Sequence, residues 1–169
     1  MSKLKKTLIL AILSGAGAVL GIIESMLPLL PAIPGGKLGL ANIVTVVALY
    51  IFGGWECILI SVVRSIISSA LYGGFNAFVY SLVGGVFSAL VMTVVYRLFS
   101  HRVTPVGVSV CGAAAHNTAQ VAVAWFVVRS NALVPYLGIL LAISLVAGIC
   151  TGFVIRECVK RIDIKVDVL

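Results

Sequence analysis

Long runs of apolar residues, each close to the length that an α-helix needs to cross a lipid bilayer, constrain this chain more than any other feature. A helix requires about 20 predominantly apolar residues to span a hydrocarbon core of about 30 Å. Of the 169 residues, 62% are hydrophobic and 10% are charged, whereas soluble domains carry about 25% charged residues. We therefore expect a single integral membrane domain over residues 1–169.

Glycines, prolines and charge clusters divide the chain into six expected membrane-spanning helices. The spans cover about residues 7–27, 38–52, 55–72, 75–99, 104–128 and 133–155, and a basic tail follows at 156–169. The apolar runs are continuous and do not alternate with a period of two residues, which argues against a transmembrane β-barrel. The predicted fold class is an all-α integral membrane protein with six transmembrane helices.

The basic residues indicate an orientation for these helices. If the N-terminus is cytoplasmic, nine of the 12 basic residues lie inside, two lie outside, and Arg64 lies within a span. The inner set is Lys3, Lys5, Lys6, Arg97, Arg102, Arg156, Lys160, Arg161 and Lys165, and the outer pair is Lys37 and Arg129. Cytoplasmic loops of membrane proteins carry an excess of lysine and arginine. This distribution favours six spans with both termini in the cytoplasm. A count of five or seven spans would not keep the excess of basic residues on one side.

The segment PAIPGGKLGLAN, residues 31–42, interrupts the apolar sequence before the short second span. Pro28, Pro31 and Pro34 recur every third residue, a period that suits a polyproline II turn. Irregular backbone is tolerated at membrane depth only where protein or a water-filled cavity covers it, and interrupted helices are pointers to binding sites in transporters. We interpret the segment as part of a ligand-facing lid; the alternative is an ordinary exposed loop.

Arg64 lies near the middle of the third expected span. It shares a polar helix face with Ser61, Ser65 and Ser68. An arginine at the centre of a membrane helix costs about 2.5–3.5 kcal/mol on insertion scales, so it must face a partner or a cavity. A binding site and a structural ion pair with Glu56 or Glu24 are both open interpretations.

The fifth expected span carries a second polar cluster. His116 and Gln120 are four residues apart and share one helix face, with Asn117 adjacent. Hydrogen bonds between helices would also explain these side chains. A metal site is not expected, because no cysteine or carboxylate stands at ligand spacing from the histidine.

One pocket toward the outer half of the membrane could unite the polar residues. Its predicted ligand-binding residues are Lys37, Asn42, Arg64, His116, Asn117 and Gln120. Lysine and arginine beside hydrogen-bonding amides suit a phosphate or carboxylate. With aliphatic walls elsewhere, the expected ligand is a small anionic amphiphile.

Small residues recur at helical spacing in the first span. Ala11, Gly15 and Ala18 form a stripe, and Gly17 with Gly21 makes a G-x-x-x-G motif. Such residues let helix backbones approach closely. The stripe could pack within this protein or dock a separate membrane subunit.

Motifs for catalysis are missing from the sequence. A prenyl diphosphate synthase needs clustered aspartates to hold Mg²⁺, but the only aspartates are Asp163 and Asp167, four apart in the C-terminal tail. There is no Walker A loop and no G-x-S-x-G motif. We therefore expect no catalytic residue, cofactor or metal in this chain, and we assign its net charge of +7 to membrane orientation instead of nucleic-acid binding.

Three segments carry a family resemblance that spans about residues 8–155. They are PGGKLGLANIVTVVALY, SLVGGVFSALVM and TPVGVSVCGAAAHNTAQ. With the Arg64 segment, they resemble the family named both Gx transporter and heptaprenyl diphosphate synthase component I. The broader group is similar to the substrate-binding S components of energy-coupling factor importers.

That resemblance implies a six-helix bundle in a bacterial plasma membrane, with residues 28–37 as an outer lid. It also implies that Ala11, Gly15 and Ala18 dock a transmembrane coupling subunit that works with separate ATPases. The ligand implied is an isoprenoid or quinone precursor. The synthase name implies instead a non-catalytic membrane subunit beside a catalytic prenyl synthase, and the sequence does not separate import from presentation to an enzyme.

Overall fold

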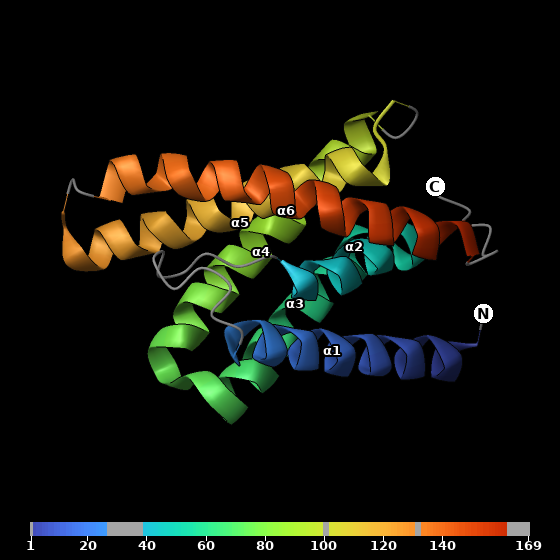
Figure 1. Cartoon of the computed structure of the whole chain (residues 1–169). Coiled ribbons are helices and arrows are strands. Elements are labelled where there is room, and N and C mark those ends of the chain that lie inside the picture. The colour runs from blue at the N-terminus through green and yellow to red at the C-terminus, as the bar shows by residue number, and fades with distance from the viewer. Residues whose placement is uncertain (1, 27–38, 100–101, 131–132, 162–169) are drawn as a thin grey trace.

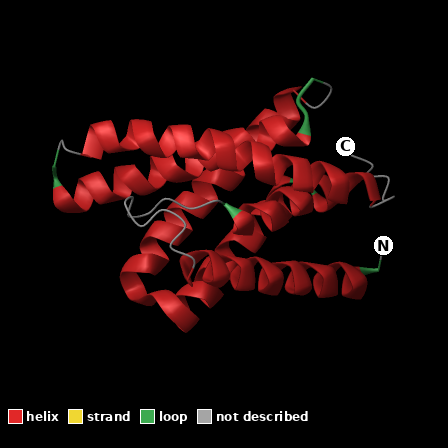
Figure 2. Cartoon of the chain, viewed as in Figure 1, coloured by secondary structure: helices red, strands yellow, loops and turns green. Residues whose placement is uncertain are grey.

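The computed structural model describes residues 2–26, 39–99, 102–130 and 133–161, and all regular secondary structure in these ranges is helical (Figure 2). The elements are α1 (Lys3–Met26), α2 (Leu40–Phe52), α3 (Gly54–Ser68), the π-helical turn η1 (Ser69–Gly73), α4 (Gly74–Phe99), α5 (Pro105–Val128) and α6 (Leu133–Arg161). The all-α class is confirmed, and each expected span coincides with one α-helix.

Within the described residues, four helices are long and apolar enough to cross a membrane, namely Lys3–Glu24, Gly54–Leu71, Gly74–Phe99 and Pro135–Arg161. Helix α2 is apolar but has only 13 residues, or about 20 Å at 1.5 Å per residue. Helix α5 has 24 residues, and its polar side chains include His116, Asn117 and Gln120. The chain thus has the helices of a membrane protein, while the count of six spans and the side of each terminus stay predictions.

Local sequence signals explain several helix ends. The Thr104 hydroxyl accepts a hydrogen bond from the Gly107 N–H, and Pro105 occupies the first turn of α5, as helix N-termini favour. Gly53 joins α2 to α3 with φ of 109°, a backbone region that glycine adopts without a steric penalty. Helix α6 ends at Arg161, six residues beyond the expected end at 155, so the first part of the basic tail is helical.

The helices of the bundle are arranged around α2 and α3 (Figure 1). Helices α5 and α6 run side by side along one side, α1 lies on the opposite side, and α2 and α3 lie between them. Figure 1 also shows that α1 begins and α6 ends at the same end of the bundle.

Glycines bring α5 and α6 into close contact. A Cβ at Gly148 would lie 2.7 Å from Cα of Val110, and one at Gly152 would lie 2.6 Å from Cα of Val106. Ser109 and Thr151 share a hydrogen bond of 2.9 Å across the same interface. Small residues and hydroxyl contacts of this kind are typical of helix pairs in membranes.

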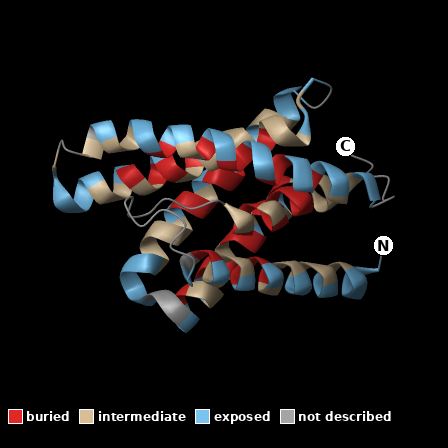
Figure 3. Cartoon of the chain, viewed as in Figure 1, coloured by how far each residue is buried: buried red, intermediate tan, exposed pale blue. Residues whose placement is uncertain are grey.

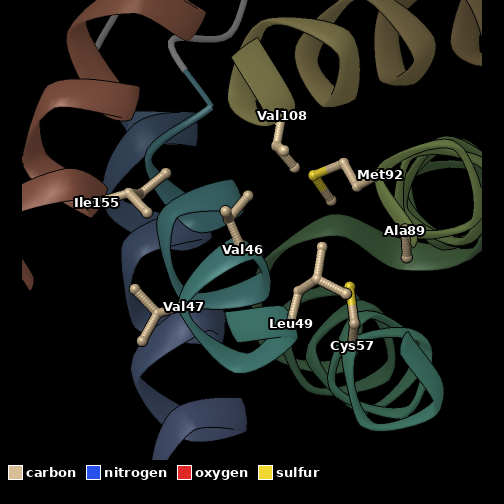
Figure 4. Packing of buried hydrophobic residues seen from close by; sticks show 8 residues of the cluster. All are labelled: Val46, Val47, Leu49, Cys57, Ala89, Met92, Val108 and Ile155. Carbon is tan, nitrogen blue, oxygen red and sulfur yellow. The ribbon is translucent and has the colours of Figure 1, made fainter. Parts of the chain in front are cut away.

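The main apolar core centres on α2, and it holds Val46, Val47, Leu49, Cys57, Ala89, Met92, Val108 and Ile155 (Figure 4). These residues come from α2 and from each of α3 to α6. The outer surface is also apolar: Phe75, Phe126 and Trp55 are each more than 70% exposed, and exposed residues cover the outside of the helices (Figure 3). An apolar exterior around a packed interior is what a lipid environment requires.

Candidate functional site

A cavity of about 80 Å³ lies where α1, α2, α3, η1, α4 and α5 meet. Its lining residues are Gly21, Ile22, Glu24, Gly39, Ala41, Asn42, Arg64, Ser68, Ser69, Ala77, Ser81, Ala113, His116 and Asn117. It lies where α1 ends, α2 begins and α3 passes into η1. The cavity is therefore displaced from the end of the bundle that holds the N-terminus (Figure 1).

The Arg64 side chain is fixed between two glycines from different helices. A Cβ at Gly17 in α1 would lie 3.1 Å from Cδ of Arg64, and a Cβ at Gly85 in α4 would lie 3.3 Å from Nη2. Arg64 is 7% exposed. Its Nε atom makes no hydrogen bond within the part of the chain that the structure describes. A buried guanidinium with an unused donor at a cavity is suited to an anion.

The two carboxylates considered as partners of Arg64 have different surroundings. Glu56 forms an ion pair with Lys6, which joins α3 to α1. Glu24 is 6% exposed, lines the cavity with Arg64 and interacts with it electrostatically. One oxygen of Glu24 also accepts a hydrogen bond from the Gly39 N–H. Glu56 is therefore paired elsewhere, Glu24 is the carboxylate that lines the cavity with Arg64, and the described part of the cavity wall carries charges of both signs.

The polar residues of α5 and α2 have separate roles. Asn117 donates hydrogen bonds to Ser144 Oγ at 2.6 Å and to the Leu140 carbonyl at 3.4 Å, so it joins α5 to α6, in agreement with the hypothesis of hydrogen bonds between helices. Asn42 Nδ2 lies 3.9 Å from Sδ of Met92. Both asparagines also line the cavity.

His116 and Gln120 pack against α4 at Gly84. A Cβ on Gly84 would lie 3.0 Å from Cε1 of His116 and 2.9 Å from Cγ of Gln120. His116 lines the cavity, whereas Gln120 is not among the described residues that do. Four predicted residues, Asn42, Arg64, His116 and Asn117, therefore meet at one cavity.

The model of the family described as heptaprenyl diphosphate synthase component I matches residues 13–158. The chain belongs to the heptaprenyl diphosphate synthase component I family. No curated protein and no solved structure matches it. The description names one component of a synthase, which implies a partner subunit that carries the catalysis.

The described wall of the cavity in this component I protein is polar. It supplies an arginine, a carboxylate, an imidazole, amides and hydroxyls, which are groups that bind and orient a polar molecule. Within the described ranges, no three histidine, cysteine, aspartate or glutamate side chains are grouped to hold a metal. Both aspartates of the sequence, Asp163 and Asp167, lie beyond the described residues.

The remaining predicted residues of this component I protein lie in different environments. Lys37 and the lid expected at 28–37 lie outside the described residues. In the proposed docking stripe Ala11 is exposed, a Cβ added at Gly15 would meet nothing within 4 Å, and Ala18 is 1% exposed. Ala11 and Gly15 are therefore accessible to a partner, while Ala18 packs inside this chain.

Sequence reasoning missed several lining residues. Ser69 lies in η1 and Ser81 in α4, where Ser81 donates to Ser65 at 3.0 Å. The serine-rich stretch around residue 65 signalled a polar face that includes Ser68, and Ser69 of the π-helical turn lines the cavity beside it. Gly85 carried no sequence signal, since its contact with Arg64 depends on how α3 and α4 pack.

Proposed function

We propose that this chain is the ligand-binding membrane subunit of a small-molecule importer and that Arg64 holds an anionic group of the ligand. The observation that carries the proposal is the buried Arg64 guanidinium at a polar cavity with its Nε donor unused. A bilayer protein retains such a residue at a cost of about 2.5–3.5 kcal/mol. Intramembrane arginines mark substrate and ion pathways for this reason.

Cavity size limits which part of the ligand is enclosed. A volume of about 80 Å³ has space for several waters at about 10–15 Å³ each. A carboxylate or phosphate head group fits in this space, and a long prenyl chain does not. For an isoprenoid or quinone precursor, the head group would occupy the cavity and the apolar remainder would lie outside it.

The place of the cavity supports an outward-facing site. The first turns of α1 carry Lys3, Lys5 and Lys6, and the last turn of α6 carries Lys160 and Arg161. These two helix ends lie at the same end of the bundle (Figure 1). Cytoplasmic segments carry such basic clusters. With that end in the cytoplasm, the cavity lies toward the outer half of the membrane, where an imported ligand would arrive.

The family description favours a second candidate, a non-catalytic membrane subunit of a polyprenyl diphosphate synthase. In that function the anion on Arg64 would be the diphosphate of a substrate or product. The catalytic aspartates and Mg²⁺ would come from the partner subunit.

Purification from native membranes separates these two functions. The tagged chain is isolated in mild detergent and its companions are identified by mass spectrometry, with an unrelated tagged membrane protein as control. Recovery of ATPases with a multi-span coupling protein is the expected result. Recovery of an aspartate-rich prenyl synthase would contradict the importer function and would favour the function of a synthase subunit.

A further inference from the structure

The charges around the cavity restrict the ligand more than Arg64 alone does. Arg64 and Glu24 are the residues with full charges among the described lining residues, and His116 is the other titratable one. Arg64 is wedged between Gly17 and Gly85, and Glu24 is tied to the Gly39 N–H. Both charged groups therefore have defined positions on the cavity wall.

A site with one cation and one anion does not favour a simple anion. Charges buried in a low-dielectric interior are stable only when they are paired. Among the described lining residues Arg64 and Glu24 carry opposite charges, so a ligand with only a negative charge would pair with Arg64 but not with Glu24. A molecule with both an anionic and a cationic group would satisfy both side chains.

We infer that the ligand of this cavity is a small amphoteric molecule, whose anionic group binds Arg64 and whose ammonium or N–H group binds Glu24. The inference rests on the proposed function and makes Glu24 the residue that determines specificity. A carboxylate can accept several hydrogen bonds at once, and one oxygen of Glu24 accepts the Gly39 N–H. Asn42 and Ser69 supply further polar groups on the cavity wall.

Three probes of similar size but different charge test the inference. β-Alanine is amphoteric, propionate is its anionic counterpart, and n-propylamine is its cationic counterpart. Binding of each probe is measured by calorimetry on the full chain in lipid nanodiscs, for the native protein and for Glu24→Gln, Arg64→Gln and Glu56→Gln. Glu56→Gln is the matched control, because this carboxylate pairs with Lys6 and does not line the cavity. Melting temperatures show that each variant is folded.

The native chain should bind β-alanine at least about tenfold more tightly than either propionate or n-propylamine, because only β-alanine pairs both charges. Glu24→Gln should reverse the preference in favour of propionate, and Glu56→Gln should not. The amphoteric ligand would be overturned if the native chain bound propionate with the same affinity as β-alanine, or if it bound none of the three probes. If Arg64→Gln binds every probe as the native chain does, the proposed function fails as well, which distinguishes the two failures.

Discussion

Gly17 of α1 lies against the side chain of Arg64, because a Cβ at this glycine would be 3.1 Å from Cδ of the arginine. One half of the G-x-x-x-G motif therefore makes room for the buried cation inside the chain. The other half, Gly21, lines the cavity next to it. Gly17 and Gly21 therefore pack within this chain, and only the other face of α1 is accessible to a partner subunit.

Gly17→Leu should destabilise the protein, because the new side chain would collide with the stem of Arg64. Overpacking of this kind costs about 1–3 kcal/mol. Gly15→Leu is the matched control, since nothing lies within 4 Å of a Cβ at that position. The free energy of unfolding in mixed micelles measures both, and equal stabilities for the two variants would contradict the packing around Arg64.

Arg64 and Glu24 should be energetically coupled. A double-mutant cycle with Arg64→Gln and Glu24→Gln is expected to give a coupling free energy of about 0.5–3 kcal/mol, because each single change leaves a buried charge with less compensation. Lys6 and Glu56 form the comparison pair, with side chains 43% and 14% exposed. Because the Lys6 side chain is partly exposed to solvent, screening should keep this coupling close to the range of about 0–1 kcal/mol that is typical of surface pairs. A smaller coupling for Arg64 and Glu24 than for Lys6 and Glu56 would show that the cavity charges act independently.

Gly15→Leu should weaken the association with a coupling subunit while it leaves the isolated chain folded. A steric cost of about 1.4 kcal/mol at the interface lowers affinity tenfold. Ala16→Leu is the control, because Ala16 is exposed and is turned by about 100° around the helix from Gly15. The yield of co-purified protein per mole of bait is the readout. An equal decrease in co-purified protein for both variants would mean that Gly15 does not lie in the docking interface in particular.

Both chain ends should lie in the cytoplasm. Reporter fusions at the N-terminus and at the C-terminus, one active only in the cytoplasm and one active only outside, determine the side of each end. The expected result is cytoplasmic activity at both ends, since basic residues cluster at both. Activity on opposite sides would require an odd number of spans and would place the cavity differently.

The sequence predicts the helices well, because glycine, proline and charge mark their limits. It predicts the fourth span at 75–99, and α4 covers Gly74–Phe99; it predicts the fifth at 104–128, and α5 covers Pro105–Val128. The largest error is at α6, which continues through Arg156, Lys160 and Arg161. Long basic side chains can extend from a helix end toward the polar interface, so a charge cluster does not mark the end of this helix.

The site is only partly predictable for a physical reason. Arg64 and Asn117 stand out because polar groups within apolar spans are costly. Which of Glu24 and Glu56 lies beside Arg64 depends on how α1 packs against α3, and a single sequence does not reveal that packing. Glu24 adds a negative charge to the cavity wall that the expectation of two positive charges did not include, and the predicted place of Lys37 lies outside the described residues.

The most direct test of the binding function is to extract and identify the small molecule that accompanies the purified protein. The native chain, Arg64→Gln and the exposed control Arg97→Gln are purified from the same membranes, and their extracts are compared by quantitative mass spectrometry. We predict one compound, close to one per chain, in the native protein and in Arg97→Gln, with a loss of about tenfold or more in Arg64→Gln. The same compound at equal amounts in all three, or none in the native protein, would contradict Arg64 as the anchor of a bound ligand.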